Sequence, residues 1–447
     1  MSEHIVITEE QKQTMLKKVV VSSFLGNFIE WFDYASYSYF AVTIGLVFFP
    51  EGDPIVTTMS AFAVFALSYL VRPIGGLFWG NMGDKKGRRW TLSISILVMT
   101  TATFLIGCLP GYAMIGLAAP FLLLLCRMTQ SFSASGEYAG ASTFIAEYAP
   151  VKKRGLYVSA VPASTATGLL VGSFFATTVF AICGGADAPF VTEWGWRFPF
   201  LIALPLGWIT NYIRTHLADS PVYEQMMEEA EAGGKEVGSK TPVRDVIRKY
   251  PRTTIICFGS AILNAIGFYA VLTFMPAYLE SVLEYDAASA GTITTIVLFA
   301  YIAFIFISGW LSDHFGRKKM LLIAAIGFVV CTIPCYMLLA TLEFYVILAA
   351  ELFMALLLCI NDGTLASYLS EQFPTEVRFT GFAFTFNLAN GLFGGSCSAI
   401  CLWLVSITGN QLAPGFYFVS IAVLALIAII FSREQSGTEL SEVKIKN

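Results

Sequence analysis

The chain has 447 residues, of which 56% are hydrophobic and only 13% are charged. A soluble domain carries about 25% charged residues, so this composition excludes an ordinary soluble protein. Apolar runs long enough to cross a bilayer as helices recur along the chain. The formal net charge of −4 adds little, because in a membrane protein the placement of charges matters more than their sum.

These apolar segments predict an all-α polytopic membrane protein with 12 transmembrane helices. The first, fourth and tenth segments exceed the about 20 residues that a bilayer requires, so we expect those helices to tilt or to extend beyond it. In chain order, the predicted spans cover 19–49, 55–79, 91–109, 116–147, 156–183, 197–215, 253–279, 289–310, 320–340, 344–370, 380–407 and 415–432.

Basic residues are divided unequally between the two sides of the predicted bundle. Of the 27 Lys and Arg residues, only Arg72, Arg127 and Arg197 lie outside the two termini and alternate loops. The loops on the other side carry acids and almost no bases. By the positive-inside rule, both termini are predicted to be cytoplasmic, which agrees with an even number of spans.

A ten-residue motif occurs twice, after the second predicted span and after the eighth. GNMGDKKGRR (80–89) and GWLSDHFGRK (309–318) both fit G-x-x-x-D-x-x-G-R-[RK]. A duplicated charged turn between membrane helices predicts two homologous halves, in a transporter that rocks one half against the other. The matching residues are Gly80, Asp84, Gly87, Arg88 and Arg89 in the first copy and Gly309, Asp313, Gly316, Arg317 and Lys318 in the second.

A second internal similarity joins EYAPVKKRG (147–155) to EQFPTEVRF (371–379). Both pairs of segments run in the same direction and are predicted to be cytoplasmic, which is the pattern of parallel repeats. The residues that match are Glu147, Pro150 and Arg154 in the first half and Glu371, Pro374 and Arg378 in the second.

The repeats and the charge pattern divide the chain into five parts. Within the central polar segment, the first part can form a short acidic helix and GGKEVGS can form a flexible link. The parts are a cytoplasmic N-terminus (1–18), an N-terminal six-helix half (19–215), a cytoplasmic connector (216–252), a C-terminal six-helix half (253–432) and a short cytoplasmic tail (433–447).

Several stretches together carry a resemblance to a known family. They are GNFIEWFDY, SYLVRPIGGLFWGNMGDKKGRR, QSFSASGEYAGASTFIAEYAP, EWGWRFPFLIALPLG, DSPVYEQ, LTFMPAYL and FPTEVRFTGFAFTFN. With these segments the chain resembles the major facilitator superfamily over nearly its whole length, and within it the metabolite:proton symporter family. The proline/betaine carriers look nearest, notably in LTFMPAYL and GEYAGASTFIAEYAP.

The resemblance implies a fold, a location and partners. The expected fold is the major facilitator fold, in which two six-helix halves are related by a pseudo-two-fold axis along the membrane normal. The expected location is the bacterial inner membrane. The expected partners are a small-molecule substrate, protons and the lipid bilayer, with no nucleic acid, and the protein is expected to be a monomer.

Charged side chains within the predicted spans are the candidates for substrate binding and proton coupling. At 1.5 Å per residue, Asp33 lies roughly 9 Å from the outer edge of the apolar core and Arg127 about 10 Å from it. The resemblance places the first and fourth spans of each half around a central cavity. Asp33 and Arg127 are therefore expected to pair.

Two helical stripes extend this pair into a predicted path for substrate and proton. Glu30, Asp33, Tyr34 and Tyr37 recur at i, i+3, i+4 and i+7 on the first span, and Arg127, Gln130 and Glu137 recur at helical spacing on the fourth. A substrate carboxylate on Arg127 is expected to release Asp33 or Glu30, which then takes up a proton. The alternative is structural: Arg127 and Asp33 only lock the two spans together, and Glu137 only packs or forms part of a gate.

The C-terminal half has fewer candidates. Tyr269 is expected to line the cavity and Asn387 to add hydrogen bonds, while Glu351 and Asp362 are the acids well inside a span. Ordinary packing of satisfied polar groups is the alternative for all of them.

Charge counting gives the expected substrate class. With one Arg and several carboxylates at mid-membrane positions, and aromatic side chains to contact a cation, a small zwitterion such as proline or glycine betaine is expected. The family also permits a small organic acid such as shikimate, α-ketoglutarate or citrate. A non-transporting membrane sensor is the alternative from a different class.

Enzymatic chemistry is not expected from this sequence. The three His residues, His4, His216 and His314, are all in terminal or loop positions, and the nine Cys residues show no metal-ligand spacing. No nucleotide-binding motif is visible. We expect no cofactor, no metal and the proton as coupling ion.

The duplicated motif is expected to form a cytoplasmic latch. Asp84 and Asp313 can interact with nearby helix N-termini or basic residues, and Gly80 and Gly309 allow close helix approach. The alternative is that the basic residues of the motif only set topology, but this does not account for an acid and glycines at the same spacing.

Overall fold

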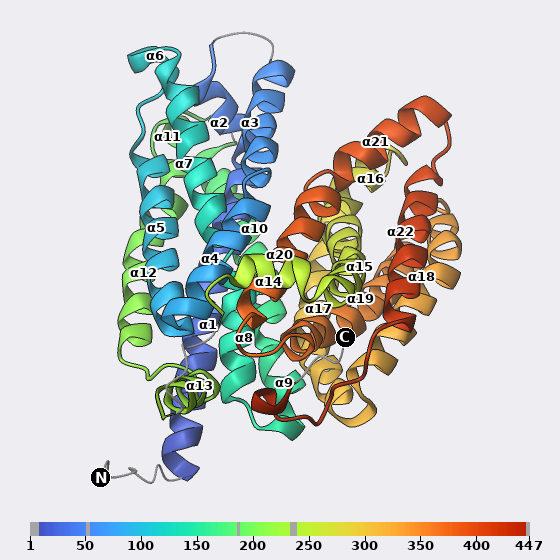
Figure 1. Ribbon diagram of the computed structural model, residues 1–447. Helices are drawn as coiled ribbons and strands as arrows, with labels where there is room; N and C mark the ends of the chain where they lie inside the picture. Colours follow the sequence, from blue (N-terminus) through green and yellow to red (C-terminus); the bar gives the residue numbers. More distant parts are fainter. Residues whose placement is uncertain (1–8, 51–53, 186–187, 233–238, 444–447) are drawn as a thin grey trace.

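A computed structural model describes residues 9–50, 54–185, 188–232 and 239–443. The described residues form two helical halves that lie side by side, with α1 to α12 in one and α15 to α22 in the other (Figure 1). In the view of Figure 1, the halves meet at the lower end and diverge at the upper end. Most of the predicted link GGKEVGS lies outside the described residues.

The N-terminal half contains the first six predicted spans. Several spans are built from two helices in series, and 3-10 turns precede α9 and α12 at Val151–Lys153 and Gly195–Arg197. The helices are α1 (Glu9–Tyr39), α2 (Ala41–Phe48), α3 (Pro54–Tyr69), α4 (Arg72–Lys86), α5 (Arg88–Cys108), α6 (Tyr112–Ile115), α7 (Ala118–Ala134), α8 (Glu137–Tyr148), α9 (Arg154–Val158), α10 (Ala160–Cys183), α11 (Pro189–Glu193) and α12 (Phe198–Thr215).

The connector contributes two short helices, and the first of them is the predicted acidic helix. The C-terminal half then contains the other six spans, and a 3-10 turn at Leu440–Glu442 lies in the tail. The helices are α13 (Pro221–Ala232), α14 (Pro242–Arg248), α15 (Pro251–Phe268), η3 (Tyr269–Thr273), α16 (Met275–Ser281), α17 (Ala287–Phe315), α18 (Arg317–Leu339), α19 (Phe344–Gln372), α20 (Arg378–Ala389), η4 (Asn390–Gly394), α21 (Cys397–Thr408) and α22 (Ala413–Ile430).

Three spans are interrupted, and local sequence explains the first of these breaks. Pro73 occupies the first turn of α4, and because proline has no N–H it cannot continue the hydrogen bonding of α3. In the C-terminal half, the seventh and eleventh spans each contain a π-helical turn, η3 and η4. Such turns are frequent at functional sites, and these two lie next to the interface between the halves.

Length and hydropathy identify most, but not all, of the predicted membrane spans. Within the described residues, 9 helical segments are long and apolar enough to cross a membrane. The predicted spans that do not meet this criterion are the first, fourth and sixth, which are formed by α1 with α2, α7 with α8, and α12. These spans contain buried charged side chains, which include Glu30, Asp33, Arg127, Glu137, Glu147 and Arg214.

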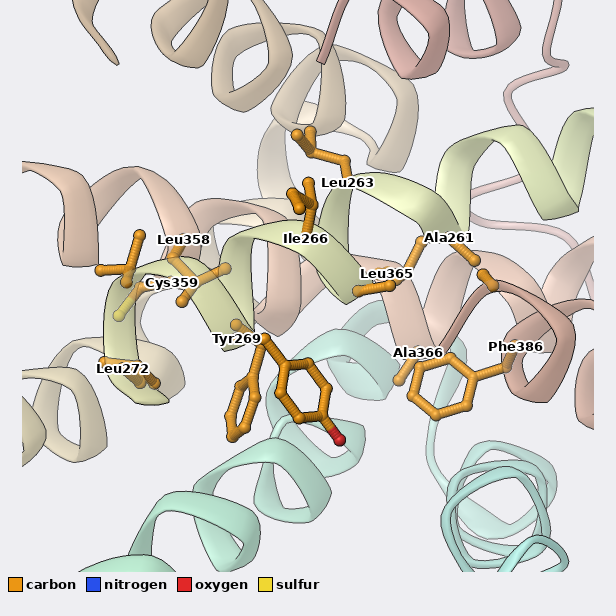
Figure 2. Close-up of a cluster of buried hydrophobic side chains, with 14 of the residues drawn as sticks. Ala261, Leu263, Ile266, Tyr269, Leu272, Leu358, Cys359, Leu365, Ala366 and Phe386 are labelled. Carbon is orange, nitrogen blue, oxygen red and sulfur yellow. The ribbon is translucent and has the colours of Figure 1, made fainter. Parts of the chain in front are cut away.

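The seventh span runs through the interior of the C-terminal half. Figure 2 shows Leu263, Ile266 and Leu272 of this span among buried side chains of α19, including Leu358 and Leu365. Close packing of these apolar side chains holds the span in place. It also positions Tyr269, whose ring points toward the helices of the N-terminal half (Figure 2).

Candidate functional site

Asp33 and Arg127 form the predicted pair. Arg127 Nη1 donates to Asp33 Oδ2 at 2.7 Å, and both side chains are buried. Gln130 donates to the same carboxylate and to Thr103 Oγ1, so the fourth span holds Asp33 from two positions. The Arg127 guanidinium also lies 3.8 Å from the centroid of the Tyr37 ring, which is a cation–π contact.

Arg127 is held at only one of its terminal nitrogens. Its Nε and Nη2 atoms are buried and have no hydrogen-bond partner among the described residues, and neither does Asp33 Oδ1. Buried donors of this kind are rare, because leaving them unpaired costs about 1–3 kcal/mol or more. The side chain therefore has spare N–H groups that suit an anionic ligand.

A second buried pair lies beside the first and involves Arg72. Its Nη2 donates to Glu30 Oε1 at 3.0 Å and its Nη1 donates to Tyr34 Oη at 3.0 Å. Its Nε donates to Asn387 Oδ1 of α20 at 3.4 Å, and Asn387 Nδ2 donates to the Ser135 carbonyl at 2.7 Å. This group of residues therefore connects the two halves of the molecule.

Tyrosine side chains extend the connection between the halves. Tyr69 Oη and Tyr269 Oη are hydrogen-bonded at 2.7 Å, with Tyr69 on α3 and Tyr269 on η3. The Arg72 guanidinium lies 5.1 Å from the centroid of the Tyr69 ring, and the Tyr34 ring lies within 6 Å of both Arg72 and Arg127. We call the group formed by Glu30, Asp33, Tyr34, Arg72 and Arg127 the central charge cluster.

Glu137 was predicted to share a path with Arg127 and Gln130, with a packing role as the alternative, and its contacts agree with the packing role. It forms a salt bridge with Arg214 of α12, and Arg214 also donates to the carbonyls of Leu92 at 2.8 Å and Ser22 at 3.2 Å. This pair ties α8 to three other helices within the N-terminal half. Glu137 therefore lies outside the central charge cluster.

The expectation of one arginine among the mid-membrane charges was wrong. Arg72, Arg127 and Arg214 are all buried and all paired with carboxylates. Arg72 and Arg214 were missed because sequence position gives the depth of a residue and not the reach of a long side chain. The clue available for Arg72 was that it is one of the few basic residues outside the basic loops.

Asp362 and Glu351, the acids well inside a span of the C-terminal half, form no ion pair with arginine among the described residues. Asp362 accepts hydrogen bonds from Asn264 at 2.7 Å, Asn361 at 2.9 Å and Tyr301 at 2.6 Å. Glu351 is buried, and its Oε1 has no hydrogen-bond partner among the described residues. The two halves thus differ most in the charges within their spans.

The first copy of the duplicated motif contacts the opposite half. Asp84 accepts hydrogen bonds from the backbone N–H groups of Phe379 at 3.1 Å and Thr380 at 2.9 Å, which begin α20. Helix N-termini favour such negative charge. A Cβ atom on Gly80 would lie 2.6 Å from Thr380 Cα, so glycine is needed for this close approach.

The second copy repeats these contacts with the halves exchanged. Asp313 accepts from the backbone N–H groups of Gly155 at 2.7 Å and Leu156 at 2.9 Å, at the start of α9. A Cβ atom on Gly309 would lie 2.6 Å from the Gly155 carbonyl oxygen. The sequence repeat therefore corresponds to a repeat of inter-half contacts, as expected of a latch.

Arginines of the motif enter two equivalent networks. Arg88 bonds Glu147 at 3.1 Å, and Glu147 also bonds Arg378 of the other half at 2.7 Å. In the second network, Arg317 bonds Glu371 at 3.2 Å, and Glu371 also bonds Arg154 of the other half at 2.9 Å. The residues matched by the second sequence similarity are thus the partners of those in the motif.

The last motif positions join each half to the end of its final span. Arg89 donates to the Leu217 carbonyl at 2.7 Å, and Lys318 donates to the Ile430 carbonyl at 2.7 Å. Before them, Gly87 and Gly316 have φ values of 94° and 93°, which glycine adopts without strain. We call the two sets of contacts made by residues 80–89 and 309–318 the motif networks.

Two family models match the chain. One, described as "Sugar (and other) transporter", matches residues 18–250, and one described as "Major Facilitator Superfamily" matches residues 256–444. The "Proline/betaine transporter" of Escherichia coli (strain K12) is 37% identical over 428 residues, which are 95% of this chain and 85% of that protein. The chain belongs to the major facilitator superfamily.

Other relatives and solved structures agree with this membership. The "Glycine betaine/proline/ectoine/pipecolic acid transporter OusA" of Dickeya dadantii (strain 3937) is 36% identical, over 95% of this chain and 85% of that protein. The proton:xylose symporter XylE bound to 6-bromo-6-deoxy-D-glucose has a TM-score of 0.77 at 18% identity, over 96% of this chain and 98% of that one. A partially occluded inward open conformation of XylE from E. coli has a TM-score of 0.67 at 18% identity, over 95% and 99%.

The predicted fold is therefore confirmed, with two six-helix halves of the major facilitator type. The relatives are transporters, so this chain is a polytopic membrane transporter and not an enzyme. In such a transporter, the central charge cluster lies where the two halves meet, and the motif networks join the halves at one end.

Proposed function

We propose that this transporter couples proton uptake to the import of a small zwitterion such as proline or glycine betaine. The observation that carries the proposal is the central charge cluster, in which arginine and carboxylate are paired out of contact with water. The names of the relatives support the substrate class. We place the transporter in the inner membrane of a bacterium, as a monomer with both termini in the cytoplasm.

The spare N–H groups of Arg127 are the proposed site for the substrate carboxylate. A carboxylate that binds there competes with Asp33 for the guanidinium. A buried carboxylate that loses its cationic partner is neutralised by taking up a proton, because an isolated charge is costly in a dry site. The substrate and the proton are then bound together, with no covalent step and no cofactor.

The pair of Glu30 and Arg72 would link this event to movement of the halves. Arg72 contacts Asn387 of α20, so a change in the cluster is passed directly to the C-terminal half. The motif networks would act as the cytoplasmic latch, because their contacts must break for the halves to separate at that end. Alternating access by rocking of the halves follows from these two sets of contacts.

Uptake by proteoliposomes tests the proposal. We expect an inward proton gradient to drive accumulation of radiolabelled proline or glycine betaine, and a protonophore to abolish it. Excess unlabelled zwitterion should compete, whereas shikimate, α-ketoglutarate and citrate should not. Accumulation that is unchanged when the proton gradient is collapsed would contradict proton coupling.

A small organic acid is the second candidate, and one observation favours it. The cluster holds two arginines, Arg72 and Arg127, and a di- or tricarboxylate needs more than one cationic partner. Competition by such an acid, with no effect of proline or betaine, would replace the zwitterion with this class.

A further inference from the structure

A narrow cavity lies between the two halves, next to the central charge cluster. It contains ≈ 260 Å³ of space free of atoms, including the part that opens to its surroundings. The N-terminal half contributes Trp31 and Tyr138 to its wall, and the C-terminal half contributes Phe268, Tyr301, Asp362 and Phe386. Little of this space is wide enough for water, so a ligand would enter when the halves part.

Asp362 is the acid in the wall of this cavity, and, like Glu351 of the same helix, it forms no ion pair among the described residues. Glu30, Asp33, Glu137, Glu147 and Glu371 all form salt bridges with arginine. The hydrogen-bond donors to Asp362 are instead the neutral side chains of Asn264, Asn361 and Tyr301. Both carboxylate oxygens accept hydrogen bonds, and no cation lies among these partners, so the carboxylate can accept the charge of a cationic ligand.

Aromatic rings surround the same space and are held by contacts with one another. Trp31 and Phe268 meet edge to face across the interface, with ring centroids 5.0 Å apart. Tyr138 and Phe386 stack across the interface, with centroids 4.3 Å apart. Aromatic faces attract organic cations, and quaternary ammonium groups are recognised by cages of such rings.

The cavity adjoins the arginines along both halves. Phe268 and Phe386 immediately precede Tyr269 and Asn387, which bond to Tyr69 and Arg72. On the first span, the Trp31 ring lies 5.6 Å from that of Tyr34, a member of the central charge cluster. The guanidinium groups of the cluster, each paired with a carboxylate, therefore lie on one side of this region, and Asp362 with the aromatic rings lies on the other.

We propose that Asp362 and the rings of Trp31, Tyr138, Phe268 and Phe386 form the subsite for the ammonium group of the substrate. This inference rests on the proposed zwitterion substrate and extends it. The arginines would take the carboxylate, and the Asp362 subsite would take a quaternary or secondary ammonium. Since its wall comes from both halves, the subsite is complete only when the halves come together on the ligand.

Two ligands that differ only in charge test the subsite. Glycine betaine and 3,3-dimethylbutanoate have the same shape, but the second has a neutral tert-butyl group in place of the ammonium. Binding to the purified full-length protein is measured by calorimetry. We expect the wild type to prefer betaine by about tenfold or more, as cation–π and charge contacts of this kind provide.

Asp362→Asn should lower betaine affinity about tenfold and leave dimethylbutanoate within about twofold, because the carboxylate contacts remain. Binding of dimethylbutanoate also shows that the variant is folded. Glu351→Gln is the matched control, since it removes another buried acid of α19, and it should keep the full preference. Phe386→Leu, which keeps the charge and removes a ring, should reduce the preference about threefold.

An Asp362→Asn protein that keeps the full preference for betaine would overturn the subsite and leave the proposed function standing. If that variant does not fold, an unchanged preference in Phe386→Leu overturns it instead. A wild-type protein that binds neither ligand would refute the zwitterion substrate itself, and the subsite with it.

Discussion

The motif networks and the central charge cluster are both built from arginine and carboxylate side chains, but they differ in symmetry. In the motif networks, Asp84 and Asp313 make the same contacts with opposite halves. In the central charge cluster, both carboxylates and both arginines come from the N-terminal half. Well inside the spans of the C-terminal half, Asp362 has neutral partners and Glu351 has an unpartnered oxygen.

This difference separates two tasks. Contacts that close one end of a two-fold molecule can be repeated, because each half presents the same surface to the other. A small substrate has no such symmetry. A site with different groups on its two sides can therefore bind it more tightly than a symmetric site. We therefore expect symmetric changes to affect movement and asymmetric changes to affect substrate and proton.

The largest loss of uptake is expected when Arg127 of the central charge cluster is replaced. Arg127→Ala leaves Asp33 buried without its cation, at a cost of roughly 3–5 kcal/mol, and deletes the proposed carboxylate site. Uptake in proteoliposomes should fall by about a hundredfold or more, corresponding to about 2.7 kcal/mol. Arg197→Ala is the matched control, because Arg197 bonds backbone carbonyls of α5 and its flanking loop, and it should keep uptake within about twofold. Equal losses in the two variants would contradict a special role for Arg127.

Asp33→Asn should separate substrate binding from proton coupling. The amide keeps the shape of the side chain and cannot take up a proton, so counterflow exchange should continue. Accumulation driven by a proton gradient should fall about tenfold or more. Glu30→Gln, measured in the same way, shows whether the neighbouring carboxylate shares this role. Full accumulation in Asp33→Asn would remove Asp33 from the coupling step.

Changes to the two motif copies should produce equal effects. Asp84→Asn and Asp313→Asn each weaken two charge-assisted hydrogen bonds to a helix N-terminus of the other half. Each should cost about 1–3 kcal/mol and lower the thermal unfolding midpoint of the purified protein, without changing substrate preference. A large difference between the two variants would show that the copies perform different tasks.

The smallest effect is expected on the pH dependence of stability. It comes from two carboxylates that accept hydrogen bonds at the start of α5 and α18. Asp219 accepts from the backbone N–H of Arg88, and Glu434 accepts from that of Arg317, so they occupy equivalent places. Burial raises the pKa of Asp219, whereas hydrogen bonds from the backbone of Ser436, Lys318 and Arg317 outweigh burial and lower the pKa of Glu434. The equivalent caps are thus expected to respond to acid in opposite directions.

The sign of each effect follows from proton binding. Glu434 stabilises the folded state at pH values above the ordinary pKa of glutamate. This contribution is lost as the pH falls through the lowered pKa of Glu434 in the folded state. The folded state holds a proton on Asp219 more tightly than the unfolded state, so that contribution increases as the pH falls. Glu434→Gln and Asp219→Asn should change the slope of the unfolding midpoint against pH in opposite directions, by about 1 °C per pH unit. Slopes that change in the same direction in both variants would contradict opposite pKa shifts for Asp219 and Glu434.

Most of the fold could be predicted from local patterns. Apolar segments gave the spans, and the repeats at 80–89 and 309–318 gave the two halves. The pair of Asp33 and Arg127 could also be predicted, because both residues lie at the same depth on spans that face the cavity in the family. The breaks at Pro73 and Tyr269 were not predicted, although a proline in the first turn of a helix was visible.

The partners of several site residues could not be predicted. Glu137 bonds Arg214 and Glu30 bonds Arg72, which sequence spacing did not show. The residues in these pairs lie far apart in the chain, and their contact depends on helix rotation and side-chain reach. The environment of Asp362 was hidden for the same reason, since its neighbours come from α15, α17 and α19.

The sequence by itself determined the twelve-span membrane fold, its duplication and the residues of the motif. These features depend on periodicity, composition and spacing along one chain segment. Only the tertiary structure decided which arginine neutralises which carboxylate, that Arg72 reaches Asn387 of the other half, and that Asp362 lies in an aromatic cavity at the interface. Such pairings are made across packed helices, where orientation and distance are set by the assembled bundle.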